Sequence, residues 1–113
     1  MEEAIKMDAL VELRNLMGDS LDDVLQTYID YIPGQIDELD QAVLKDDAES
    51  VFNLAHKMKS SSSSIGALGI ARLAEQIELI GRAGSTEGTA ELVEQLKGMY
   101  ADAEVLLREQ LRK

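Results

Sequence analysis

The sequence predicts an all-α protein, built as an antiparallel up-down four-helix bundle with a short additional N-terminal helix. Three observations predict this fold class. Apolar residues recur at steps of three and four along most of the chain, β-branched runs are few, and only one of the 113 residues is proline. No linker or internal repeat divides the chain, so we expect residues 1–113 to form one domain.

The first two helices are expected over residues 4–17 and 20–44. A glycine ends the first, and Ser20 is the predicted N-cap of the second, with Asp23 in a capping-box-like position. The apolar stripe of the second segment keeps its phase across Pro33, which favours one long helix kinked at the proline over two separate helices. The side chains expected to face inward are Ile5, Leu10, Leu13 and Leu16, then Leu21, Val24, Leu25, Tyr28, Ile32, Ile36, Leu39 and Val43.

Three more helices are expected over residues 47–65, 68–83 and 88–111, separated by turns that contain glycine. Asp46 and Asp47 are the predicted caps of the first of these helices. Short loops between long amphipathic helices make sequence neighbours antiparallel, which gives the bundle. The inward side chains of the last two helices are expected to be Ile70, Leu73, Ile77 and Ile80, then Leu92, Leu96, Met99, Ala103 and Leu106.

The chain is strongly acidic, with 22 Asp plus Glu against 11 Lys plus Arg and a formal net charge of −11. A negative surface disfavours binding to nucleic acids and to anionic membranes, because the phosphates of both attract positively charged side chains. The sequence has no Cys, no signal-peptide pattern and no apolar stretch near the roughly 20 residues that span a bilayer. We therefore expect a cytoplasmic protein without a disulfide framework or a cysteine nucleophile.

The acidic residues avoid one segment of the chain. Residues 50–74 contain no Asp or Glu and three Lys or Arg, whereas about five acids would be expected there from the average frequency. This segment also holds the only histidine, His56, and five consecutive serines that begin at Ser60. The gap in the acids marks the candidate functional surface.

His56 is expected to point to solvent. At 100° per residue it lies about 160° from Met58, the centre of the buried stripe on its helix. Phe52 lies one turn earlier on the exposed side, where its ring either is covered by a partner or tucks its edge into the bundle. Lys59 lies one turn later, where its ammonium can approach the imidazole or an anion attached to it.

A lone exposed histidine without a second His or a Cys does not make a metal site, and no Gly-x-Ser-x-Gly segment points to a hydrolase. A neutral imidazole can instead attack a phosphoryl group, and the product needs a nearby cation and room for a partner. The inner nitrogen must then hold the proton, which a carboxylate on the next helix could enforce. A hairpin that turns at Gly66 brings Glu78 near the right height, with Glu75 as the second choice. Alternatively, Glu78 is an ordinary solvated acid paired with Arg82.

The segment Leu54-Ala55-His56-Lys57-Met58-Lys59-Ser60-Ser61, followed by Ile65-Gly66-Ala67 and Leu73, resembles the signature of histidine-containing phosphotransfer (HPt) domains. That signature is commonly Ala-His-x-Leu-Lys-Gly-Ser and then an apolar-Gly-Ala segment. The resemblance covers nearly the whole chain in helix order and length. It implies that His56 is the phospho-acceptor and that Lys59 contacts the phosphoryl oxygens. Some family members place a carboxylate or amide 22 residues after the histidine to orient the imidazole, and Glu78 has that spacing.

The resemblance implies a phosphorelay carrier and not an enzyme. His56 would accept a phosphoryl group from the aspartate of a receiver domain or hybrid sensor histidine kinase and pass it to the aspartate of a response-regulator receiver. The residues expected to bind these partners are Phe52, Lys57, Ser60 and Ser63. Ser60 stands where the family usually has Gly. In those family members the Gly lets a receiver approach closely. We expect a monomer without a cofactor; the Mg²⁺ of the reaction should belong to the receiver, and without a nucleotide loop the chain should not phosphorylate itself from ATP.

Two alternatives stay open at this point. A helical adaptor could use the same fold and the face around Phe52 to bind a signalling partner without any phosphate chemistry. The chain could also be the phospho-acceptor domain excised from a larger chemotaxis-type or hybrid histidine kinase, although its short ends favour a free-standing protein. The effect of His56→Ala on partner binding and on signalling separates the carrier from the adaptor.

Overall fold

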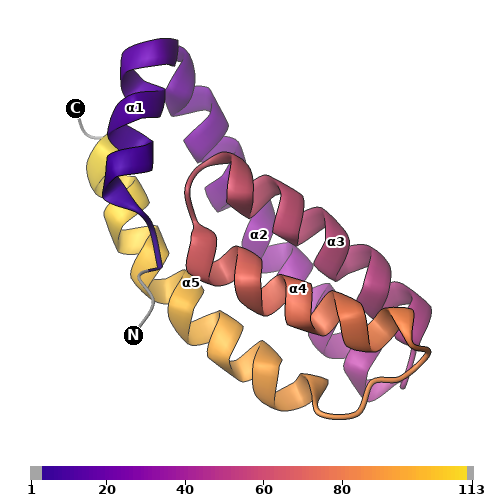
Figure 1. Cartoon of the computed structure of the whole chain (residues 1–113). Coiled ribbons are helices and arrows are strands. Elements are labelled where there is room, and N and C mark those ends of the chain that lie inside the picture. Colours follow the sequence, from indigo (N-terminus) through magenta and orange to yellow (C-terminus); the bar gives the residue numbers. More distant parts are fainter. Residues whose placement is uncertain (1–3, 112–113) are drawn as a thin grey trace.

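The computed structural model describes residues 4–111 and confirms the all-α fold class. Its helices are α1 (Met7–Met17), α2 (Ser20–Leu44), α3 (Ala48–Ser64), α4 (Leu68–Arg82) and α5 (Thr89–Leu111). Within the described residues, α2 and α4 each pack against both α3 and α5, which closes a ring of four antiparallel helices (Figure 1). α2 is a single helix through Pro33, as the phase of its apolar stripe predicts.

The long helices α2 and α5 have 25 and 23 residues, whereas α3 and α4 have 17 and 15. At 1.5 Å per residue the long pair is about 12 Å longer and projects beyond the α3–α4 turn (Figure 1). α1 packs on this overhang, where Arg14 pairs with Asp22 at 2.8 Å and donates a hydrogen bond to the carbonyl of Gln110. The N-terminal helix therefore covers the end of the bundle.

One expected helix start and one expected cap are wrong. α1 begins at Met7 and not at residue 4, and Ser20 is not an N-cap, because Asp19 precedes α2 and no side chain caps it. The backbone N–H of Leu21 instead donates to the carbonyl of Gly18 in the tight α1–α2 turn. This turn satisfies a donor that would otherwise need a side-chain acceptor.

The predicted cap of α3 is confirmed for Asp47. Its carboxylate accepts hydrogen bonds from the hydroxyl of Ser50 at 2.7 Å and from the backbone N–H of Ser50 at 3.1 Å. These bonds lower the pKa of the Asp47 carboxyl. Asp46 does not cap the helix; it takes a left-handed conformation with φ of 56° in the turn before it.

The core lies between the four bundle helices, but some predicted inward residues are misplaced. Leu16 and Val24 are exposed, because α1 extends past the bundle and Val24 lies at the edge of a groove. Ile80 is only half-buried. On α5 the buried face is centred about one residue later than predicted, because the ring of Tyr100 belongs to it, and Leu92, Met99 and Leu106 flank it half-buried. The buried apolar side chains of α5 are Val93, Leu96, Tyr100, Ala103 and Leu107.

Pro33 leaves a gap in the hydrogen bonds of α2 that α5 fills. Proline has no N–H, so the carbonyl of Ile29, four residues earlier, lacks its helical donor. The hydroxyl of Tyr100 donates to that carbonyl at 3.4 Å, and its ring lies 6.3 Å from that of Tyr28. The contact between α2 and α5 thus satisfies a buried backbone group that the sequence of α2 leaves open.

The turn between α3 and α4 requires a glycine. Gly66 has φ of 81°, and a Cβ there would lie 2.9 Å from the Cβ of Ala9 in α1. The carbonyl of Gly66 accepts a hydrogen bond from the N–H of Lys6 at 2.8 Å. This close contact fixes the α3–α4 hairpin, which carries the site described next, against the N-terminal segment.

Candidate functional site

His56 lies in the middle of α3 and points outward, as the helical wheel predicts. Its side chain is 55% exposed, whereas Val51, Ala55 and Met58 of the same helix are fully buried. The ring is therefore accessible to another molecule. Its inner edge faces the neighbouring helix α4.

Glu78 of α4 contacts the imidazole directly. Its Oε2 lies 2.8 Å from Nδ1 of His56, and its side chain is only 1% exposed. An ionised carboxylate can only accept a hydrogen bond, so Nδ1 carries the proton and donates it to Glu78. The lone pair of the neutral ring is then on Nε2. Glu75, the second choice from sequence, is exposed and makes no such contact.

Two cations also contact the carboxylate of Glu78. Lys59 of α3 places Nζ 2.7 Å from Oε1, and Arg82 of α4 places a guanidinium nitrogen 3.6 Å from Oε2. Burial works to raise the pKa of Glu78, but the contacts with Lys59 and His56 outweigh it, and the pKa lies below the usual value. Glu78 is thus a buried, ionised acid and not a solvated one. In this state Lys59 is held on Glu78, beside the imidazole.

Phe52 neither turns into the core nor stands free. It is half-buried, and its ring stacks on that of His56 with 6.0 Å between centroids and 21° between planes. The guanidinium carbon of Arg82 lies 5.7 Å from the centre of the Phe52 ring. The imidazole is therefore held by a carboxylate at one nitrogen and by an aromatic ring at its side.

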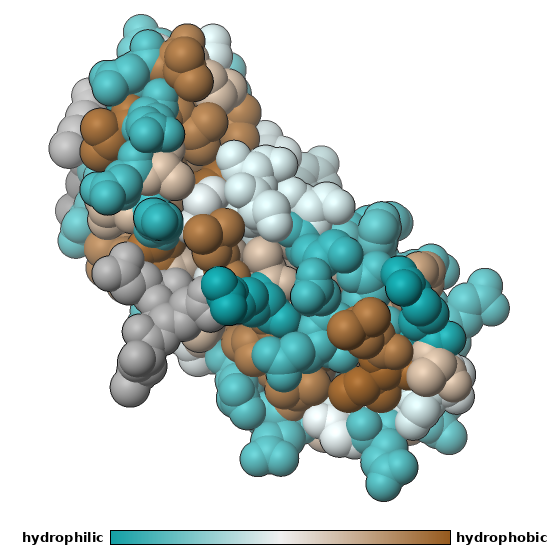
Figure 2. All heavy atoms as spheres, viewed as in Figure 1, coloured by the Kyte–Doolittle hydropathy of each residue, from teal (hydrophilic) through white to brown (hydrophobic). Residues whose placement is uncertain are grey.

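The other predicted partner-binding residues lie at the surface of α3. Lys57, Ser60 and Ser63 are all exposed. Ser60 and Ser63 line a shallow hollow between α3 and α4, and Lys57 lies outside it. Figure 2 shows weakly polar atoms gathered over the end of α3, with strongly polar atoms on one side and a mixture of polar and apolar atoms toward α1 on the other. The remaining residues that line the hollow are Lys59, Leu68, Ala71, Arg72 and Glu75.

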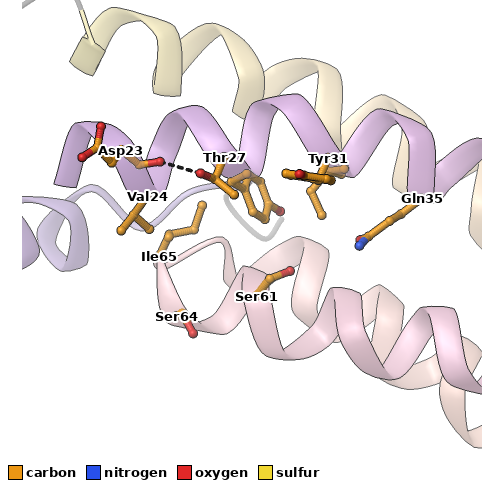
Figure 3. A pocket seen from close by; sticks show the side chains of 10 residues that line it. Asp23, Val24, Thr27, Tyr31, Gln35, Ser61, Ser64 and Ile65 are labelled. Atoms are coloured by element: carbon orange, nitrogen blue, oxygen red, sulfur yellow. Dashed lines mark hydrogen bonds between the residues drawn. The ribbon is translucent and has the colours of Figure 1, made fainter. Parts of the chain in front are cut away.

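A second, more apolar groove of about 530 Å³ lies between α2 and α3. Figure 3 shows Tyr31 and Gln35 of α2 opposite Ser61 of α3. Tyr28 lines the groove, and its hydroxyl is hydrogen-bonded at 2.7 Å to the hydroxyl of the fully buried Ser62. Burial raises the pKa of Tyr28. The sequence did not indicate this groove, because it depends on the distance between the axes of α2 and α3.

Within residues 4–111, no three His, Asp or Glu side chains are grouped so that they could hold a metal ion. No helix in the same range is both long and apolar enough to cross a membrane. Sequence reasoning also missed the stacking of Phe52 on His56 and the placement of Arg82 over the Phe52 ring. The spacing of four puts Phe52 and His56 on one face of α3, and Glu78 and Arg82 on one face of α4, but it does not give the side-chain conformations that bring Arg82 over the Phe52 ring.

A family model and a solved structure match the chain. The family model described as Hpt domain matches residues 23–105. The crystal structure of histidine-containing phosphotransfer protein B (HptB) from Pseudomonas aeruginosa PAO1 has the same fold, with a TM-score of 0.92. The two chains are 23% identical, and the alignment covers 99% of this chain and 97% of that one. No curated protein matches the chain in sequence.

Proposed function

Because the chain belongs to the Hpt domain family, and is thus a histidine phosphotransfer protein of phosphorelays, we propose that His56 is the residue that carries the phosphoryl group. The observation that supports this assignment most strongly is the hydrogen bond between Nδ1 of His56 and the buried carboxylate of Glu78. It leaves a lone pair on Nε2 of a ring that is half-exposed. His56 is also the only histidine in the chain.

The proposed step needs no proton transfer by the protein. The Nε2 lone pair of His56 attacks the phosphorus of an aspartyl phosphate, a P–N bond forms, and the P–O bond to the aspartate breaks with its electron pair returning to that carboxylate. Both ring nitrogens are then substituted, and the imidazole becomes a cation. The ionised carboxylate of Glu78, 2.8 Å from Nδ1, stabilises this charge as it develops. The reverse sequence returns the group to the aspartate of a second receiver.

Lys59 and Arg82 set the electrostatics of the proposed acceptor. Together with Glu78 they give one net positive charge beside a neutral imidazole. An incoming phosphoryl group therefore meets a positive local field. We propose that Lys59 turns from Glu78 to the phosphoryl oxygens when His56 is phosphorylated, because its side chain is 28% exposed and has a flexible stem.

The proposed partners are receiver domains, namely those of response regulators and of a hybrid sensor histidine kinase in the cytoplasm. Phe52, Lys57, Ser60 and Ser63 would lie in the contact, in the segment that contains no carboxylate. The Mg²⁺ of the reaction would be bound by the receiver. In this proposal the chain acts as a monomer and gains no phosphate from Mg-ATP alone.

The assignment is tested by phosphotransfer from an isolated phosphorylated receiver. The wild-type chain should gain an acid-labile, base-stable phosphate, and His56→Gln should gain none. Gln95→Ala, on the exposed side of α5, is the control and should behave as wild type. Transfer that survives intact in His56→Gln would overturn the assignment.

Binding measurements separate this carrier from an adaptor. If the chain relays phosphate, His56→Gln should still bind the unphosphorylated receiver, because the proposed contact residues Lys57, Ser60 and Ser63 stay exposed on α3, while relay is lost. If the chain is an adaptor, His56→Gln should change neither partner binding nor signalling.

A further inference from the structure

Gly81 is a buried glycine in the last turn of α4, and neither backbone conformation nor helix stability accounts for it. Its φ is not in the left-handed region that favours glycine, unlike those of Gly66 and Gly84. Inside a helix, glycine is less favourable than alanine by about 1 kcal/mol. The reason for glycine at this position has to lie outside α4.

The backbone of α3 provides that reason. A Cβ at Gly81 would lie 2.8 Å from the backbone nitrogen of Phe52, 3.1 Å from its Cα and 3.0 Å from the carbonyl oxygen of Ala48. Ordinary contacts of a Cβ begin at 3.4 Å. All three neighbours are main-chain atoms of a hydrogen-bonded helix, so they cannot swing away as the end of a long side chain could. At Gly81 the backbones of α3 and α4 touch.

This contact lies one helical turn from the His56–Glu78 pair. Gly81 follows Glu78 by three residues, and Phe52 precedes His56 by four. Because the helices are antiparallel, the Gly81–Phe52 contact and the Glu78–His56 contact are successive cross-helix contacts. The distance between the two backbones at the first contact therefore sets the distance between the side chains at the second.

The Glu78–His56 pair has little tolerance for a change in that distance. Nδ1 and Oε2 are 2.8 Å apart, and an N–H···O hydrogen bond weakens beyond about 3.2 Å. A methyl group at position 81 would need a shift of about half an ångström to reach an ordinary contact. The same shift would carry the pair to the limit of hydrogen bonding.

The close approach also fixes the ring of Phe52. Because the main chain of Phe52 abuts Gly81, its side chain runs along the surface and stacks on His56, with Arg82 above it. Separation of the helices would draw Arg82 away from this ring and lengthen the carboxylate contact, whereas the Phe52–His56 stack lies within α3. The contact that holds the proton on Nδ1 thus depends on this backbone approach.

We propose that Gly81 is a positioning residue for phosphotransfer: it lets α4 approach α3 closely enough for Glu78 to hold the proton on Nδ1 of His56. This inference rests on the proposed function of His56, but its geometric part can be tested without phosphate.

The test compares Gly81→Ala with Gly98→Ala. Gly98 lies in α5, and a Cβ there meets nothing within 4 Å, so both changes improve helix propensity and only one separates two helices. In ¹⁵N NMR of the unphosphorylated chain, wild type and Gly98→Ala should show a single tautomer protonated at Nδ1. Gly81→Ala should show both tautomers of His56. An unchanged His56 spectrum in Gly81→Ala would overturn the proposal.

A double-mutant cycle shows whether Gly81 acts through Glu78. We expect Gly81→Ala to lower the rate of phosphotransfer about tenfold in the wild-type background and to have no further effect in Glu78→Ala. An equal loss in both backgrounds would overturn the proposal. So would an unfolded Gly81→Ala chain beside a folded Gly98→Ala chain, because the proposal requires α3 and α4 to move apart by about half an ångström within a folded chain. The tautomer measurement keeps its meaning even if His56→Gln retains transfer.

Discussion

The α3–α4 pair and the α2–α5 pair of the bundle use polar groups in opposite ways. Between α3 and α4, the buried carboxylate of Glu78 organises a histidine and two cations beside the segment 50–74, which contains no acid. Between α2 and α5, the hydroxyl of Tyr100 donates a hydrogen bond to the carbonyl of Ile29, which lacks its helical donor because of Pro33. The first set of contacts orients a reactive ring, and the second completes a helix. Substitutions in the two pairs should therefore affect different quantities.

The largest difference should come from Glu78→Ala. Loss of the acceptor for Nδ1–H allows the wrong tautomer of His56 and removes the charge that stabilises the phosphorylated ring, so the rate of phosphotransfer should fall about 100-fold. Glu78→Gln keeps an oxygen that can accept the hydrogen bond from Nδ1–H, so its rate of phosphotransfer should fall less. The matched control is Glu75→Ala, an exposed acid on the same helix, and rates from a phosphorylated receiver measure all three. A Glu75→Ala rate as low as that of Glu78→Ala would remove the distinction between the two acids.

On the other side of the bundle, Tyr100→Phe should leave phosphotransfer unchanged and lower the free energy of unfolding by about 1 kcal/mol, because the carbonyl of Ile29 loses its donor. Pro33→Ala restores the helical N–H for that carbonyl. Tyr100→Phe should then lower the free energy of unfolding by a smaller amount in the Pro33→Ala background, which urea unfolding measures. Equal losses in both backgrounds would mean that the hydroxyl does not compensate for the proline.

Low pH should weaken the contacts between α3 and α4, and high pH should weaken those between α2 and α5. The pKa of Glu78 is lowered from 4.5, so its contribution to stability is present above pH 4.5 and is lost as the pH falls below it. Burial raises the pKa of Tyr100 to about 12 from 10, so its contribution is present below pH 10 and is lost between pH 10 and 12. In a series of Tm against pH, Glu78→Ala should flatten the acid side and Tyr100→Phe the alkaline side. The pKa of Tyr28 is also raised by burial, so the Tyr100→Phe variant should still lose some stability at alkaline pH.

The smallest effect is expected from Lys97→Ala. Lys97 bridges α5 to Asp40 of α2 and also pairs with Glu94, as Lys59 bridges α3 to Glu78, but its partners are partly exposed. An exposed ion pair contributes little to stability, because water screens it. Thermal unfolding should shift slightly and phosphotransfer should not change. A loss of transfer in Lys97→Ala would show that the two pairs of helices are not independent.

The sequence predicted most of the fold because each helix carries its own local signals. Periodic apolar residues located all five helices, and Asp47 marked the start of α3 correctly. The errors lie where local pattern does not decide. Leu16 belongs to a periodic segment, but α1 extends past the bundle and leaves it exposed. Tyr100 was left out of the stripe on α5, which misplaced its buried face by one residue.

The candidate site was predicted in part for the same reason. A helical wheel and the length of a hairpin place His56 outward and Glu78 opposite it, and the structure brings the two together at 2.8 Å. Neither method gives the distance between two helix axes. The backbone contact at Gly81 depends on that distance, so it appears only in the structure. The stacking of Phe52 on His56 lies within α3 and depends on the conformations of the two side chains, which the helical wheel does not give either.

The hydrogen bond from Tyr100 to Ile29 also bears on how the chain folds. Its two residues are 71 positions apart, so the middle of α2 completes its hydrogen bonding only after the last helix has docked. A fragment that ends before α5 would keep an open carbonyl at Ile29 in an apolar surface. α2 and α5 therefore gain and lose order together, and amide exchange around Pro33 should occur by unfolding of the whole bundle instead of local fraying.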